Sequence, residues 1–187
     1  ILVAGTAFIG ADNDFALARI SADGATVTTN THDFAGAGSN EIGQGVAFNP
    51  ANGLIYVSGS DTTGNSIAVA SFLNDATLAF QTDATVQIAA TPSAGFGVSV
   101  APDGRVFVAG SGFSGAQAAI ARFNADLTAP LVNAYNVDNA GQESAFDVIV
   151  DQTTGQAFLV GGADVAGDTD FFVLRIEPTG LIEQARN

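Results

Sequence analysis

Short apolar runs separated by turn residues repeat four times along the chain, and one run in each copy ends in glycine. These glycine-ended runs cover residues 1–5, 55–59, 106–110 and 157–161. β-Branched and aromatic residues crowd the runs and helical periodicity is absent, so we predict strands throughout. Repeats of roughly 51 residues are typical of a solenoid, a propeller or an array.

Each full copy contains four runs of strand length. The first run lies at 45–48, 97–100 and 146–150, and a turn containing Pro, Asn, Asp or Gly joins it to the glycine-ended second run. The third run lies at 15–20, 67–72, 119–123 and 171–176. The fourth is richer in Thr, as at 25–29 and 78–82, which suits a strand at the outer edge of a sheet.

The second and third runs are apolar at consecutive positions, so both faces of each small sheet must be covered. A propeller blade meets this condition because it packs between two neighbouring blades. We therefore predict an all-β fold, a β-propeller of about four four-stranded blades of roughly 51 residues. Residues 1–187 would form a single domain, with repeats at 1–42, 43–93, 94–143 and 144–187.

The first copy begins at its second run, so the first blade is expected to lack its first strand, which leaves fifteen strands in total. Three explanations compete. The chain is a piece of a longer repeat protein, or a four-bladed ring closes with one three-stranded blade, or another chain donates the missing strand. The third explanation follows from the ability of an unpaired edge to accept an added strand.

The repeat resembles the bacterial beta-propeller repeat family of the SBBP type, which occurs in large bacterial surface and secreted proteins. The similar segments are 53–59, the Asp-led strands 14–19 and 170–175, and the approach to a first strand at 141–146. The chain departs from the family by carrying Arg where Lys is frequent, and Ser71 at that position in the second copy. The resemblance implies a propeller in an extracellular or surface setting and implies no catalytic residues.

Charge narrows the choice of partners. The chain has 5 basic residues, all Arg, against 19 acidic ones, for a net charge of −14. Such a field repels nucleic acid and anionic membranes, and no apolar run is long enough to insert in a membrane. With no Cys, disulfides, zinc knuckles and thiol nucleophiles are excluded. The small fraction of charged residues, 13%, and the abundance of Thr, Asn, Gly and Ala favour a secreted or cell-surface bacterial protein.

Two acidic loops between second and third strands are the best candidates for a metal site, because calcium prefers six to eight oxygen ligands. The candidate ligands are Asp12, Asp14, Asp164, Asp168 and Asp170. Neither loop completes the Asp-x-Asx-x-Asx-Gly calcium motif, and the equivalent loops of the middle copies are nearly uncharged. A solvated turn is therefore the simpler interpretation, and calcium is the alternative.

Arg19, Arg122 and Arg175 share one repeat position. We expect them to pair with neighbours between blades, with the Asp five residues earlier as a partner; a ring that grips a carboxylate or sulfate is the alternative. We expect His32, the only imidazole, to be a surface or turn residue, since no nucleophile or zinc spacing accompanies it. Tyr56, Tyr135 and Phe113 are candidates for a sugar-stacking platform.

The sequence favours a non-enzymatic structural or interaction module of a bacterial extracellular or cell-surface protein. Its partner would be protein, including copies of itself in an oligomer or filament assembled through the open strand edge, in a scaffold or adhesion role. A propeller that binds calcium or carbohydrate through its acidic loops is the alternative. No other cofactor is indicated.

Overall fold

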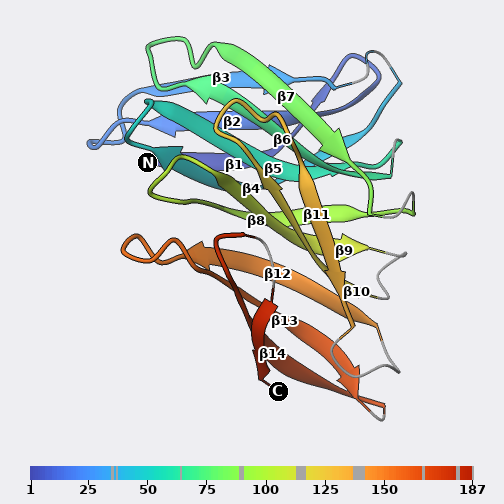
Figure 1. Ribbon diagram of the computed structural model, residues 1–187. Helices are drawn as coiled ribbons and strands as arrows, with labels where there is room; N and C mark the ends of the chain where they lie inside the picture. Colours follow the sequence, from blue (N-terminus) through green and yellow to red (C-terminus); the bar gives the residue numbers. More distant parts are fainter. Residues whose placement is uncertain are drawn as a thin grey trace.

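The computed structural model describes residues 1–34, 36, 38–63, 65–88, 91–112, 117–136, 142–165, 167–179 and 182–186. Within these ranges the chain forms fifteen strands and no helix, so no helix there could cross a membrane. The all-β prediction and the number of strands are confirmed. The strands form four antiparallel sheets, which we call the first to fourth blades in chain order (Figure 1).

The first blade has three strands and the other three blades have four each. The first consists of β1 (Leu2–Ile9), β2 (Asp12–Ile20) and β3 (Val27–His32), and the second of β4 (Glu41–Asn49), β5 (Leu54–Asp61), β6 (Ser66–Leu73) and β7 (Phe80–Val86). The third consists of β8 (Ala94–Val100), β9 (Val106–Gly112), β10 (Gln117–Phe123) and β11 (Leu131–Tyr135), and the fourth of β12 (Glu143–Val150), β13 (Ala157–Val165), β14 (Asp168–Ile176) and β15 (Ile182–Arg186).

Each sheet is an antiparallel meander in which strands adjacent in sequence pair with each other. Gly53, Gly104 and Gly155 close the turns between the first and second strands of their blades with positive φ angles of 72°, 86° and 73°, as turn glycines at these places predict. By its sequence β1 corresponds to the second strands β5, β9 and β13. The first blade therefore lacks the strand that β4, β8 and β12 provide in the others.

The first strand of each full blade carries a β-bulge, located between residues 43 and 45, 95 and 98, and 145 and 147. Two first strands begin slightly before the expected repeat boundaries, because the pairing extends to Glu41 opposite Asp61 and to Glu143 opposite Ala163.

Three apolar clusters hold the blades together, one at each junction between consecutive blades. Phe15 and Val57 belong to the first junction, Val69 and Val108 to the second, and Ile120 and Phe172 to the third. Figure 1 shows the sheets following one another, with the fourth blade at the opposite end of the row from the first. Among the described residues, no strand of the first blade packs extensively against a strand of the fourth blade. Closure of the sheets into a ring is therefore not shown.

The two middle blades are covered on both faces, whereas the end blades are covered on one. Nearly every residue of β5, β6, β9 and β10 is buried, as their consecutive apolar residues predict. In contrast, no residue of β1 is fully buried, and the first four residues of β14 are exposed while its remaining residues alternate between buried and partly buried. The end blades therefore present apolar side chains to solvent at positions that neighbouring blades cover in the middle of the chain.

Candidate functional site

Five carboxylates gather where the first blade meets the second, and we call them the acidic group: Asp12, Asp14, Asp33, Glu41 and Asp61. Asp12 and Asp14 belong to the beginning of β2. Glu41 opens β4, and its pairing partner across the ladder is Asp61 at the end of β5. All of these except Asp33 are buried. The group thus contains one of the two acidic loops that the sequence indicates.

Described residues of the connection from β3 to β4 satisfy some oxygens of this group. Ser39 Oγ lies 2.5 Å from Glu41 Oε1 and 3.2 Å from Asp33 Oδ1. The backbone N–H of Gly38 donates a hydrogen bond to Asp12 Oδ2. Two other oxygens, Asp14 Oδ1 and Glu41 Oε2, are buried and accept no hydrogen bond. Ionising these two carboxyls is therefore costly.

Burial is the main reason why the pKa of the Asp14 carboxyl lies above its usual value, and the neighbouring Asp33 and Asp12 raise it further. Burial also raises the pKa of Glu41; the Ser39 hydroxyl opposes that shift, and Asp33, Asp61 and Asp14 add to it. In the part of the chain that the structure describes, no three His, Asp or Glu side chains are arranged to hold a metal ion. The acidic group is thus a place of like-charge repulsion, not an assembled metal centre.

The second acidic loop is the tip of the β13–β14 hairpin. Asp164, Asp168 and Asp170 are exposed there, and Asp164 Oδ1 accepts a hydrogen bond of 2.9 Å from Thr169 Oγ1. The tip lies in the fourth blade and the acidic group lies between the first and second, so the five predicted ligands do not form one site. The three carboxylates lie on the strands themselves, Asp164 near the end of β13 and Asp168 and Asp170 at the beginning of β14.

Arg19 and Arg122 each reach from one blade to the next. Arg19 Nη1 donates to Asn74 Oδ1 at 3.2 Å, and Arg122 Nη1 donates to the Pro178 carbonyl at 2.9 Å. Both acceptors lie in the turn between the third and fourth strands of the following blade. The expected pairing with an Asp five residues earlier is wrong for Arg19, because five residues of extended strand span about 16 Å. Arg175 occupies the same repeat position on β14.

Tyr56 replaces the arginine in the second blade. Ser71 stands at the arginine position there, and Tyr56 is its partner across the ladder. The Tyr56 hydroxyl donates at 2.7 Å to the carbonyl of Ala125, which holds the same place in its turn as Pro178 does in the next blade. Tyr56 is fully buried. It therefore joins two blades and does not provide the sugar-stacking surface that was expected.

His32 also joins two blades, so the prediction of a surface or turn histidine is wrong. Its side chain is only 14% exposed, and Nε2 lies 2.6 Å from Asp83 Oδ2 on β7 of the second blade. The ring stacks on Phe80, with centroids 3.9 Å apart and planes 9° from parallel. The sequence around His32 gave no sign of these partners, because they lie about one repeat away.

Of the other expected platform residues, Tyr135 packs against the core, where burial raises its pKa to about 12, and Phe113 lies outside the described residues.

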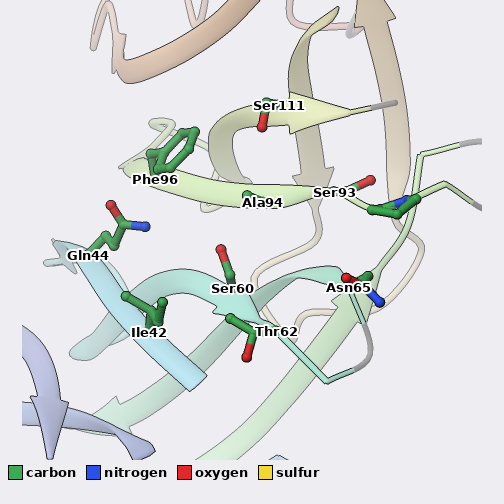
Figure 2. Close-up of a pocket in the computed structure, with 10 residues that line it drawn as sticks. Ile42, Gln44, Ser60, Thr62, Asn65, Ser93, Ala94, Phe96 and Ser111 are labelled. Carbon is green, nitrogen blue, oxygen red and sulfur yellow. The ribbon is translucent and has the colours of Figure 1, made fainter. Parts of the chain in front are cut away.

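A pocket of about 430 Å³ opens between the second and third blades (Figure 2). Its polar lining consists of hydroxyl and amide groups, including Gln44, Ser60 and Ser93, and Phe96 lies on its β8 side. Several of these groups are already occupied, since Ser60 Oγ pairs with the backbone of Gly95 and Ser93 Oγ with that of Ile88. Among the described residues that line the pocket, none has a titratable side chain.

Sequence reasoning assigned Tyr56 to a different role and missed Glu41, although the repeat contained a signal for each. The ladder partners opposite the arginine position are Phe107 for Arg122 and Tyr56 for Ser71. The loss of arginine is thus accompanied by a gain of a hydroxyl on the neighbouring strand. Glutamate recurs at positions 41 and 143, the first residues of two first strands, and both side chains are buried.

The four meandering sheets, packed in chain order around interleaved apolar clusters, define a β-propeller domain. A family model described as a domain of unknown function (DUF5122) beta-propeller matches residues 1–26 and 101–129. Both matched segments contain a second and a third strand, with Arg19 and Arg122. The match supports a β-propeller and does not extend to the bacterial surface repeat family that the sequence resembles.

Comparison with solved structures agrees at the level of the fold. The chain is similar to a chain in the crystal structure of a nidogen/laminin complex, at a TM-score of 0.51 and 13% identity, covering 100% of this chain and 60% of that one. An exo-β-1,3-galactanase from Phanerochaete chrysosporium, solved with β-1,3-galactotriose, gives a TM-score of 0.32 at 10% identity over 96% of this chain and 61% of the other, too low to support an argument. The chain spans less than two thirds of either protein. No curated protein matches the sequence.

Proposed function

We propose that the chain is a non-enzymatic structural and interaction module of a bacterial extracellular or cell-surface protein, and that its end blades make the contacts. The observation that supports this proposal is the difference between middle and end blades. Strands of similar apolar sequence are covered on both faces in the second and third blades and on one face in the first and fourth. An apolar surface of this kind is typical of a protein interaction site.

Large exposed apolar side chains gather on both end blades. On the first blade they are Ile1, Val3, Phe8, Ile9 and Val27, and on the fourth they are Phe146, Ile149, Val160 and Phe171. Phe171 is 78% exposed, although the next residue, Phe172, is fully buried against the third blade. The two surfaces differ in sequence, so contact between the first blade of one copy and the fourth blade of another would be head to tail. Contacts of that type produce rings or filaments.

The ligand-binding alternative has less support. The carboxylates expected to bind calcium are divided between two distant places, and the expected aromatic platform loses Tyr56 to the core. The described lining of the pocket between the second and third blades contains no charged side chain. The proposed module therefore works through protein contacts, and its extracellular setting follows from the composition and from the resemblance to surface repeats.

Light scattering on the purified chain over a range of concentrations tests self-assembly. We expect species at multiples of 18.8 kDa. Phe171→Asp should shift the distribution towards the monomer, because it replaces the most exposed large apolar side chain of the fourth blade with a charge. Phe48→Asp is the matched control, since Phe48 is a partly exposed phenylalanine on the second blade. A strict monomer at every concentration, or equal effects of the two substitutions, would contradict assembly through the end blades.

A further inference from the structure

In three blades, the first and second strands approach each other so closely that one glycine is required. A Cβ at Gly59 would lie 1.8 Å from the carbonyl oxygen of Ile42, and one at Gly110 would lie 2.1 Å from that of Ala94. At Gly161 the distance to the Ser144 oxygen would be 2.0 Å. Real side chains do not tolerate such distances. The bulge of the first strand next to each glycine brings its backbone over the second strand, where only glycine leaves enough room.

Gly5 holds the same repeat position in the first blade, where no first strand is present. A Cβ built there would meet no atom within 4 Å, and its φ is not in the left-handed region. Neither space nor backbone conformation within the described chain therefore requires glycine at this position. The requirement would appear if a bulged strand paired with β1 as β4, β8 and β12 pair with their neighbours.

The free edge of β1 has the other properties of an acceptor. β1 is the outermost strand of its sheet and pairs with β2 alone. The groove of about 310 Å³ that Val3 and Gly5 line with residues of β2 and β3 lies across the uncovered face of the first blade and not along this edge. Val3 is half exposed, whereas its counterparts Val57 and Val108 are fully buried at junctions with the preceding blade. A strand added at this edge would satisfy the unpaired backbone groups of β1.

We propose that the edge of β1 binds an extended segment that has the pattern of the first strands of this repeat. The pattern is a Gly or Ala opposite Gly5, a bulge, and then a Val opposite Val3, as Gly43 and Val46 stand opposite Gly59 and Val57 in the second blade. The segment runs antiparallel to β1 and binds by strand addition. This inference rests on the proposed interaction function and names the chemistry of one partner.

A second folded copy is not the occupant. In the described chain all three segments with the required pattern, β4, β8 and β12, are already paired with β5, β9 and β13. A copy could supply one only by unfolding a blade. The occupant is therefore a first-strand segment that is not engaged in a blade of its own.

A labelled peptide with the sequence of residues 41–49 tests the proposal. Titrated into the full chain, it should bind saturably by fluorescence anisotropy and should slow hydrogen exchange at the amides of β1. Gly5→Val should fold with an unchanged melting temperature, because the new side chain enters open space, and should lose peptide binding. Ala18→Val is the matched control: it lies on β2 opposite Val3, away from the edge, and should bind as the wild type does.

Each outcome has a distinct meaning. Failure of the peptide to bind the wild-type chain, or equal binding by the Gly5→Val variant, would overturn the acceptor edge. If the chain self-assembles but does not bind the peptide, the proposed function stands and this inference fails. If the chain is monomeric and binds the peptide through β1, the acceptor edge stands and self-assembly fails.

Discussion

Removing the Tyr56 hydroxyl tests whether specific hydrogen bonds hold neighbouring blades together. The Tyr56→Phe change keeps the buried ring and deletes the 2.7 Å hydrogen bond to the Ala125 carbonyl in the third blade. It also deletes a 3.0 Å bond from Asn52 Nδ2, whose side chain can turn to water instead. The main cost is a carbonyl left without this donor at a blade junction. Loss of such a bond reduces the free energy of unfolding by about 1–3 kcal/mol.

In a chain of this size, that loss corresponds to a fall in melting temperature of roughly 2–12 °C. Thermal and urea unfolding followed by circular dichroism would measure it. The structure also predicts a rescue. Adding Ser71→Arg to Tyr56→Phe recreates the Phe107 and Arg122 pair of the third blade, where the guanidinium reaches the equivalent turn carbonyl. The double variant should regain much of the lost stability.

Ser71→Met with Tyr56→Phe is the control, since it adds length without hydrogen-bond donors and should give no rescue. A loss smaller than about 0.5 kcal/mol for Tyr56→Phe would mean that the hydroxyl bond adds nothing to the apolar junction. Equal stability of the arginine and methionine double variants would show that bulk alone matters at position 71. Either result would refute the exchange between tyrosine and arginine.

Three further predictions concern the acidic group and the glycine positions. Folding raises the pKa values of Asp14 and Glu41, so the stability linked to these carboxyls is present below their unfolded-state pKa values and is lost as pH rises through their folded-state pKa values. Glu41→Gln should therefore raise the melting temperature more at pH 8 than at pH 4. An effect that does not depend on pH would contradict this. Gly110→Ala should prevent correct pairing of β8 with β9, since its Cβ would meet the Ala94 oxygen at 2.1 Å, and a wild-type melting curve would refute the close approach. Calcium and a chelator should give equal melting temperatures, because the described residues contain no group arranged to hold a metal ion; a calcium-dependent rise would restore the binding alternative.

The strands were predictable because each blade follows the same local rules. Glycine turns, apolar runs and the lack of helical periodicity all repeat, so an ambiguity in one copy is resolved by the others. The absence of a first strand from the first blade was also readable, since Gly5 aligns with Gly59 in its repeat. Local sequence rules do not determine how the blades are arranged in space, and the structure does not show that they close into a ring.

The side-chain partners were harder to predict because they lie one repeat away in sequence. His32 pairs with Asp83 and Arg19 with Asn74, and both contacts depend on the rotation between blades. The expected pair of Arg19 with Asp14 failed for the opposite reason, because residues close in sequence are far apart on an extended strand. Asp12 and Asp14 were found as candidates, but Glu41 and Asp61 complete their surroundings from another blade.

Because the blades repeat within one chain, contacts that the end blades lack can be identified by comparison with the middle blades. A position covered in two or three blades and uncovered in one shows which contact the uncovered blade lacks. By this comparison Gly5 lacks a bulged first strand, and Val3 lacks the preceding blade that covers Val57 and Val108. Phe171 lies at the same place in its repeat as Ala118 in the third blade, and Ala118 is fully buried against the fourth. Under the proposed interaction function, Phe171 is therefore the side chain of the fourth blade that a partner surface would cover in the way that the fourth blade covers Ala118.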